Sequence, residues 1–172
     1  MAPTSYQSPT RGDDNRSSSQ SAESALSKSN ATVSTILDEK GRNVFAVRPQ
    51  DTIATATQLM KEKGIGAVVV KDAAGVLVGI LSERDIVRQL ADTPGETLDQ
   101  IVDSVMTKDP VTCTPDELLV EMMKRMSEGK FRHLPVLDGG GLGGMITIGD
   151  VVSYRLRELE YEALRMKQMI VG

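Results

Sequence analysis

The chain of 172 residues has few groups that could support metal or disulfide chemistry. It contains one cysteine, Cys113, and one histidine, His133. A single cysteine cannot form a disulfide within the chain, and one cysteine with one histidine does not make a metal-ligand cluster. We therefore expect no metal site, and the lone thiol fits a reducing compartment.

Aromatic side chains and excess positive charge are also scarce. The sequence has no tryptophan, two phenylalanines and three tyrosines, and its formal net charge is −4. Surfaces that bind nucleic acid use basic patches to contact phosphates and aromatic rings to stack on bases. Nucleic acid is therefore not an expected partner.

Long apolar runs are missing as well. No stretch reaches the roughly 20 residues that a membrane-spanning helix needs, and the N-terminus lacks the charged and then apolar order of a secretory signal. We expect a cytoplasmic protein with no membrane contact.

Residues 1–30 differ in composition from the rest of the chain. They are rich in Ser, Gln, Asn, Thr and Pro and hold almost no apolar side chains. Such a segment buries too little apolar surface to offset the entropy lost on ordering. We predict a disordered tail that takes no part in the fold.

The remaining sequence contains a duplication with a period of about 65 residues. The two halves stay in one register apart from a one-residue deletion in a loop of the second half. The pairs that define this register are Pro49 and Pro115, Met60 and Met126, Val70 and Val136, and Asp85 and Asp150. Chance similarity would scatter over several registers.

Each half has the pattern of a β-α-β-β-α unit, with apolar strands around a helix of period 3.6 and a turn before the last strand. The expected strands are Val44–Val47, Ala67–Val70 and Val76–Leu81 in the first half, and Val111–Cys113, Leu134–Leu137 and Leu142–Ile146 in the second. One unit alone has too little apolar surface for a stable core. We therefore predict an α/β (α+β) fold in which repeats 33–92 and 97–155 pack together.

The last strand of each half ends in the same motif: glycine, two apolar residues, Ser or Thr, two variable residues and Asp. The copies are Gly79-Ile80-Leu81-Ser82-Glu83-Arg84-Asp85 and Gly144-Met145-Ile146-Thr147-Ile148-Gly149-Asp150. A hydroxyl at the start of a helix lies beside free N–H groups and the positive end of the helix dipole, which suits oxygen-rich ligands. The Asp one turn later can accept both hydroxyls of a ribose.

A capping box explains either motif alone, because Ser-x-x-Asp can simply satisfy the first N–H groups of a helix. Two copies in one register, each with the same upstream glycine, favour a ligand site. One Asp can also serve both purposes.

The duplication, the two motifs and the segment Phe131-Arg132-His133-Leu134-Pro135-Val136 together resemble a tandem pair of cystathionine-β-synthase (CBS) domains of the stand-alone bacterial type. The resemblance covers residues 33 to 155. It implies two clefts related by a pseudo-twofold axis, which bind AMP, ADP, ATP, NAD(H) or S-adenosylmethionine in different family members.

The resemblance also implies ligand contacts residue by residue. Asp85 and Asp150 would bind ribose, with Ser82 and Thr147 beside the sugar or its first phosphate. The other implied contacts are Arg132 and His133 at the phosphates of the nucleotide held by Asp85, Val111 and Pro135 at its base, Arg84 at the Asp150 site, and Ile80 and Met145 beside the two adenines.

The two implied sites are not equivalent. Gly66 stands in the first repeat where the second has Arg132, and Gly149 stands in the second where the first has Arg84. An arginine can hold a phosphate with two hydrogen bonds and a glycine cannot. We expect the sites to differ in ligand or affinity, one taking a mononucleotide and the other a longer ligand such as NAD(H).

No arrangement of nucleophile and base, paired acids or metal ligands points to catalysis. We therefore expect a non-catalytic sensor of AMP or ATP, with NAD(H) as a further ligand, that has no catalytic cofactor and regulates another protein in trans. For His133, a partly buried structural role and a phosphate contact are equally favoured, and Cys113 is expected to pack rather than react.

Residues 156–172 extend beyond the second repeat with a heptad pattern. Its apolar members are Val152, Leu156, Leu159, Ala163, Met166 and Ile170. Such a stripe can pack on its own domain or on a partner helix, and we favour a homodimer formed through the CBS helices and this extension. The alternative function is a dimerising interaction module that binds no nucleotide.

Overall fold

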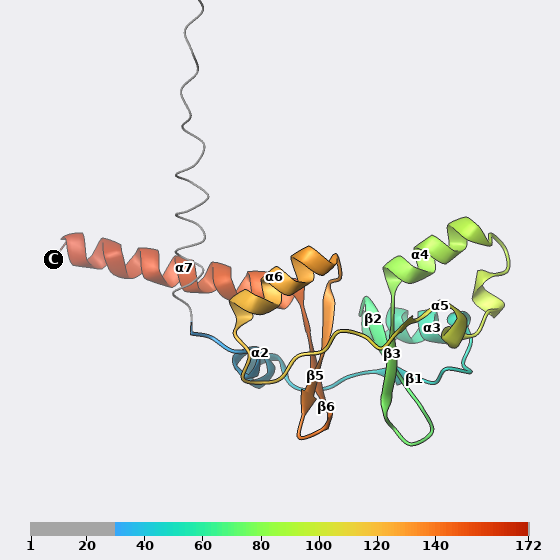
Figure 1. The fold of residues 1–172 in the computed structure, drawn as a ribbon. Coiled ribbons are helices and arrows are strands. Elements are labelled where there is room, and N and C mark those ends of the chain that lie inside the picture. The colour runs from blue at the N-terminus through green and yellow to red at the C-terminus, as the bar shows by residue number, and fades with distance from the viewer. Residues whose placement is uncertain (1–29, 172) are drawn as a thin grey trace, which may run out of the picture. The chain divides into compact units, whose positions relative to one another are not determined.

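The computed structural model describes residues 30–171. The tail predicted to be disordered, residues 1–30, lies outside the described residues except for Asn30. The first repeat supplies α3 (Ile53–Lys63), β1 (Ala46–Val47), β2 (Ala67–Lys71), β3 (Leu77–Ser82) and α4 (Glu83–Asp92). The second supplies α6 (Leu119–Gly129), β5 (His133–Asp138), β6 (Gly141–Thr147) and α7 (Ile148–Val171) (Figure 1). At its N-terminal end the first repeat also contains α2 (Val33–Lys40), and the second also contains η1 (Thr97–Asp99), α5 (Val102–Val105) and β4 (Thr107–Lys108).

Strand pairing follows the duplication. In the first repeat β1 runs parallel to β2, β2 pairs antiparallel with β3, and β3 pairs antiparallel with β4. In the second, β5 and β6 form an antiparallel pair, and Cys113 bridges in parallel to Val136 just as Val47 pairs with Val70. The predicted α/β fold of two β-α-β-β-α repeats with a long C-terminal helix is confirmed.

One predicted strand is wrong, because Val111–Cys113 reduces to the single bridge at Cys113. In the first repeat the N–H of Val69 donates to the carbonyl of Phe45 at 3.1 Å. The residue equivalent to Val69 is Pro135, which has no N–H to donate. The second ladder therefore lacks this bond.

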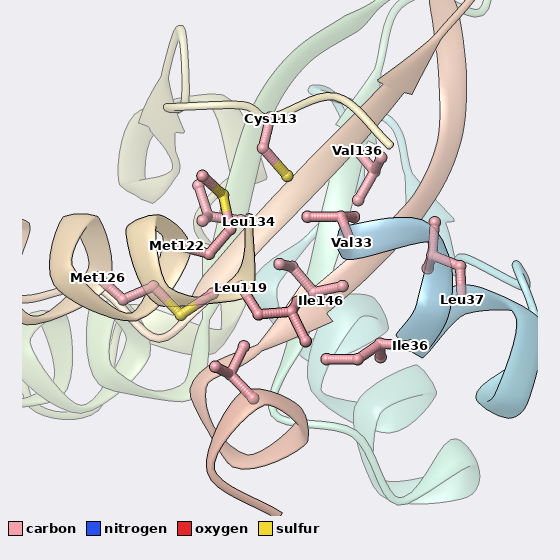
Figure 2. Close-up of a cluster of buried hydrophobic side chains, with 11 residues drawn as sticks. Val33, Ile36, Leu37, Cys113, Leu119, Met122, Met126, Leu134, Val136 and Ile146 are labelled. Atoms are coloured by element: carbon pink, nitrogen blue, oxygen red, sulfur yellow. The ribbon is translucent and has the colours of Figure 1, made fainter. Parts of the chain in front are cut away.

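The two repeats have separate apolar cores. The first consists of Val47, Ile53, Ala56, Met60, Val68, Val70, Leu81, Ile86, Val102 and Met106. The second, whose side chains converge between α2, α6 and the β5–β6 pair in Figure 2, consists of Val33, Ile36, Leu37, Cys113, Leu119, Met122, Met126, Leu134, Val136, Ile146 and Val151. Each core therefore contains residues from outside its own repeat.

The N-terminal helix of each repeat, α2 or α5, packs on the other repeat. Val33, in α2, donates its N–H to the Glu117 carbonyl at 2.9 Å, and Val102, in α5, donates to the Asp51 carbonyl at 2.8 Å. We did not predict α2, α5 or β4. Each repeat thus supplies one helix that packs on the other repeat, and these two exchanged segments hold the repeats together.

The two exchanged segments then diverge. Helix α5 has four residues and leads into β4, which lies along β3 through the pair Ile80 and Thr107. Helix α2 has eight residues, and in the described part of the chain no strand pairs with the outer edge of β6. Because α2 is longer, Glu39 and Lys40 at its C-terminal end lie beside the second motif.

The last helix is continuous from the second motif to the end of the described chain. It runs from Ile148 to Val171, so the predicted extension 156–172 continues α7 without a break as far as it is described. Among residues 30–171, no helix combines the length and the apolar character that crossing a membrane requires.

Candidate functional site

The first motif joins β3 to α4 through a capping box. Ser82 is the N-cap, and Asp85 Oδ2 accepts hydrogen bonds from the Ser82 N–H at 2.9 Å and from its hydroxyl at 2.6 Å. The Asp85 N–H points back to Ser82 Oγ at 3.4 Å. Among the described residues, none donates a hydrogen bond to Asp85 Oδ1. This oxygen can therefore accept a hydrogen bond from a hydroxyl group of a ligand.

The second motif repeats this geometry where β6 meets α7. Asp150 Oδ2 accepts from the Thr147 N–H at 2.8 Å, and the Asp150 N–H donates to Thr147 Oγ1 at 3.1 Å. Both motifs are therefore helix caps, as the capping alternative requires. The caps also hold each carboxylate at a fixed orientation.

A cavity of about 340 Å³ lies between the two repeats beside Asp85. Its lining includes most of the residues assigned to the first site from the sequence: Ile80, Ser82, Asp85, Val111, Arg132 and His133. Gly66, the first-repeat counterpart of Arg132, lines the same cavity. The first repeat contributes the carboxylate and the helix N-terminus, and the second contributes Arg132 and His133. The cavity therefore needs both repeats.

Further lining residues were given no ligand contact in the sequence analysis. They are Glu83, Arg88, Thr107, Asp109, Pro110, Gly129, Lys130 and Phe131. Arg88 lies one helical turn after Asp85, and Lys130 and Phe131 directly precede Arg132, so spacing alone could have indicated these three. Thr107 and Asp109 depend on β4 and its continuation, whose pairing with β3 was not predicted.

Positive charge gathers around the first cavity. Four cationic residues line it, namely Arg84, Arg88, Lys130 and Arg132, against the acidic residues Glu83, Asp85 and Asp109. The Arg84 guanidinium donates from Nη1 to the Lys130 carbonyl at 2.5 Å, which ties α4 to the end of α6. A cationic wall opposite an Asp suits a ligand with a sugar at one end and phosphate at the other.

His133 lies half-buried at the wall of this cavity. Burial lowers its pKa from the ordinary value of 6.5, and this effect exceeds the opposing influence of the nearby carboxylates of Glu83 and Asp150. Lys40 and Arg132 lower the pKa further. The imidazole is therefore neutral at pH 7 and offers one donor and one acceptor rather than a charge.

A second cavity, of about 290 Å³, lies beside the other motif. It is lined by Ile36, Glu39, Lys40, Thr147, Gly149, Asp150, Ser153 and Arg157. Lys40 Nζ lies 2.6 Å from Asp150 Oδ2. Arg157 pairs with Glu39 at 2.6 Å across the same cavity. The carboxylate assigned to ribose thus already has a cationic partner.

Three residues lie elsewhere than the resemblance implied. We expected Arg84 to face the Asp150 site, but it lines the first cavity. Pro135 and Met145 are paired across the β5–β6 ladder and appear in the lining of neither cavity.

Cys113 packs in the second core with 2% of its surface exposed. Burial, followed by the nearby Glu117 carboxylate, raises the pKa of its thiol to about 12. The thiolate form that reacts is therefore scarce at neutral pH. In the part of the chain that the structure describes, no group of three His, Cys, Asp or Glu side chains could hold a metal ion.

With this geometry in view, comparison with known proteins places the chain in a family. The family model of the CBS domain matches residues 33–92 and 102–157. The chain belongs to the CBS-domain family, with two CBS domains in tandem.

Solved structures agree with this assignment. A CBS-domain containing protein from Agrobacterium tumefaciens is 43% identical, with a TM-score of 0.71 over 73% of this chain and 99% of that one. The structure of CBSX2 in complex with AMP is 28% identical, with a TM-score of 0.57 over 67% of this chain and 90% of that one.

A curated relative is an uncharacterised 17.7 kDa protein of Acidianus ambivalens, 38% identical over 109 residues. The match takes in 63% of this chain and spans 65% of the length of that relative.

Proposed function

We propose that this protein is a non-catalytic regulatory module that binds an adenosine nucleotide in the Asp85 cavity. The candidate ligands are AMP, ADP, ATP and NAD(H). The observation that carries the proposal is the meeting of Asp85, on the first repeat, with Arg132, on the second, across one cavity of about 340 Å³. Support comes from the related protein CBSX2, which was solved with AMP.

Each part of the nucleotide has a matching group in this cavity. Asp85 Oδ1 accepts a ribose hydroxyl while Oδ2 keeps the helix cap. Ile80 and the exposed Val111 flank the base on its two faces. Arg132, with Arg88 and Lys130, holds the phosphates by charge-assisted hydrogen bonds, which are stronger than neutral ones.

The Asp150 cavity is the weaker site in this proposal. A ligand there meets a carboxylate whose Oδ2 is already paired with Lys40, and it finds Gly149 where the first motif has an arginine. We therefore expect one nucleotide to bind per chain at concentrations that fill the Asp85 cavity.

Ligand binding regulates by changing how the repeats pack. Because the cavity walls come from both repeats, a nucleotide binds best to the arrangement in which Asp85 and Arg132 are both within reach. Such differential affinity shifts the population of conformations. The shift is passed on to a partner protein in trans.

One observation favours a second function. Both motifs are complete helix caps without a ligand, and α7 exposes an apolar stripe that includes Leu156 and Met166. A dimerising interaction module that binds no nucleotide would show the same two features. The two functions differ in whether the Asp85 cavity binds a ligand.

Isothermal titration with AMP, ATP, NADH and S-adenosylmethionine tests the proposal. We expect heat from at least one ligand, with one binding event per chain, and a roughly 10- to 100-fold weaker affinity for Asp85→Asn. Asp150→Asn serves as the matched control, because it alters the same motif in the other repeat. Absence of heat from all four ligands, with wild type folded by circular dichroism, refutes nucleotide binding and leaves the interaction module.

A further inference from the structure

Beyond the second repeat, α7 presents a continuous apolar stripe that no described part of the chain covers. At its start, Val151 is buried and Tyr154 packs against the second core. The large apolar side chains of the stripe are 41% to 84% exposed. They are Val152, Leu156, Leu159, Met166 and Ile170. Figure 1 shows α7 continuing past α6 toward its C-terminal end.

On its own in water, a helix with such an exposed stripe has little stability. The segment from Leu156 to Ile170 is about 22 Å long at 1.5 Å per residue, and isolated helices of this length are marginally stable. Contiguous exposed apolar surface in a folded protein marks an interaction site. We therefore expect the stripe to pack against the surface of a partner.

The spacing indicates that the partner is another helix. Apolar residues follow one another at intervals of four and three, which is the a and d pattern of a coiled coil. Leu156, Ala163 and Ile170 take the a positions, and Val152, Leu159 and Met166 take the d positions. Nearly three heptads are present, which is long enough for a short coiled coil supported by folded domains.

Charges on the flanks match a second copy of the same helix in parallel. Glu162 lies at a g position and Lys167 at the e position five residues later. In a parallel pair, g of one helix faces e of the next heptad in the other. Symmetry then forms two Glu162–Lys167 ion pairs, one on each side of the seam.

An antiparallel pair that overlaps the whole stripe brings like charges together. Its e positions face each other and its g positions face each other, so Glu160 meets Glu160 and Glu162 meets Glu162 of the second copy. Like charges in these places oppose association. The charge pattern therefore discriminates against the antiparallel arrangement.

We propose that α7 binds α7 of a second copy of this chain as a parallel, in-register two-stranded coiled coil. The pairing covers the stripe from Val152 to Ile170 and sets a two-fold axis along the seam. It rests on the exposed stripe and its charges alone, so it holds whether or not the Asp85 cavity binds a nucleotide.

Light scattering on the full chain tests whether the stripe forms the dimer. We expect wild type at twice the chain mass of 18.6 kDa and Leu159→Glu at the monomer mass. The control is Tyr161→Glu, because Tyr161 is 65% exposed on the opposite, f position of the helix. It should remain dimeric, and all three chains should show the same thermal unfolding of the repeats. A dimeric Leu159→Glu or a monomeric wild type overturns the proposal.

A charge exchange tests the orientation. Glu162→Lys places two repulsive pairs in the parallel dimer and should weaken dimerisation about tenfold. Adding Lys167→Glu to the same chain restores both ion pairs with reversed signs and should recover the wild-type dissociation constant. In the antiparallel arrangement residue 167 faces Ser153, so the second change does not rescue the first. Failure of rescue overturns the parallel assignment.

A disulfide provides the second test of orientation. Ile170→Cys at the last a position should form a disulfide-linked dimer on mild oxidation, because the two residues meet only in the parallel register. In the antiparallel arrangement they lie at opposite ends of the stripe. Wild type is the control, since Cys113 is buried with a thiol pKa of about 12. Absence of the cross-link in Ile170→Cys contradicts the parallel arrangement.

Discussion

The two halves of this protein carry the same motif at the same place, yet among the described residues only one of the two motif carboxylates, Asp150, is held in an ion pair. Asp85 faces a cavity shared by both repeats, whereas Asp150 is paired with Lys40 at 2.6 Å. The difference arises outside the motifs. Beside Asp85, helix α5 has only four residues and is followed by β4. Beside Asp150, helix α2 has eight residues and ends at Lys40.

This difference shows that a duplicated unit keeps its fold through its core and varies its site through the segment exchanged with the other repeat. Leu81 and Ile146 occupy equivalent, fully buried positions. The residues that distinguish the sites, such as Lys40 and Asp109, lie in the segments that cross over. Changes at exposed positions of these segments, such as Lys40 and Asp109, alter a site at little cost to the fold.

The largest expected effect comes from breaking the exchange itself. Leu37 is 1% exposed, and although it belongs to the first repeat it packs in the core of the second. Leu37→Ala should lower the free energy of unfolding by about 2–5 kcal/mol, measured by urea denaturation. Leu98→Ala, at a 48% exposed position, is the control and should cost far less. Equal losses in both variants would refute the exchanged core.

The next effect concerns the difference between Arg132 and its counterpart Gly66. Arg132→Gln removes the arginine that the first repeat lacks at the matching position, and it should weaken nucleotide binding at the Asp85 cavity roughly 10- to 100-fold in titration calorimetry. Arg42→Gln is the control, because Arg42 pairs with Asp138 and lines neither cavity. An unchanged affinity in Arg132→Gln would mean that the phosphates lie elsewhere.

A third variant should make the two sites more alike. Lys40→Met frees Asp150 from its cation, and because exposed ion pairs contribute little stability the fold should hardly change. Titration calorimetry should then detect a second, weaker binding event per chain. Lys124→Met, which removes an exposed pair with Glu128 on α6, should leave the stoichiometry at one. A single event in Lys40→Met would show that Lys40 does not close the second cavity.

The smallest expected effect is the pH dependence contributed by His133. Its folded pKa lies below the unfolded value of 6.5, so the unfolded chain binds the proton more readily. Stability is therefore complete above pH 6.5 and decreases as the pH falls from 6.5 through the lowered folded pKa. Thermal unfolding of wild type and His133→Gln between pH 7.5 and pH 5 should show a smaller decrease in the variant. Identical decreases would assign the effect to other groups.

The sequence predicted the fold well because the duplication constrained each half by the other. The register of Val70 and Val136, the two motifs and the long last helix all follow from periodicity and spacing. The sequence also placed Asp85, Val111 and Arg132 at one site through the family resemblance, and the structure brings all three to the same cavity.

What the sequence could not predict depends on short elements and distant contacts. Helix α5 has four residues and β4 has two, too few for a periodic signal. Lys40 and Asp150 are 110 positions apart, so no local pattern links them. The family resemblance assigned Arg84 to the other site, and no local pattern indicated its bond to the Lys130 carbonyl, which depends on how α4 and the end of α6 meet.

Pro135 reduces the backbone pairing of the segment around Val111, which lines the Asp85 cavity. Its missing N–H removes the ladder bond that would fix the carbonyl of Val111, so the chain leading to Cys113 is held by fewer backbone bonds than its counterpart in β1. Amide protons near Val111 should therefore exchange with solvent faster than those near Phe45. A nucleotide that orders this segment loses part of its affinity to the entropy cost, and slower exchange on binding would reveal that ordering.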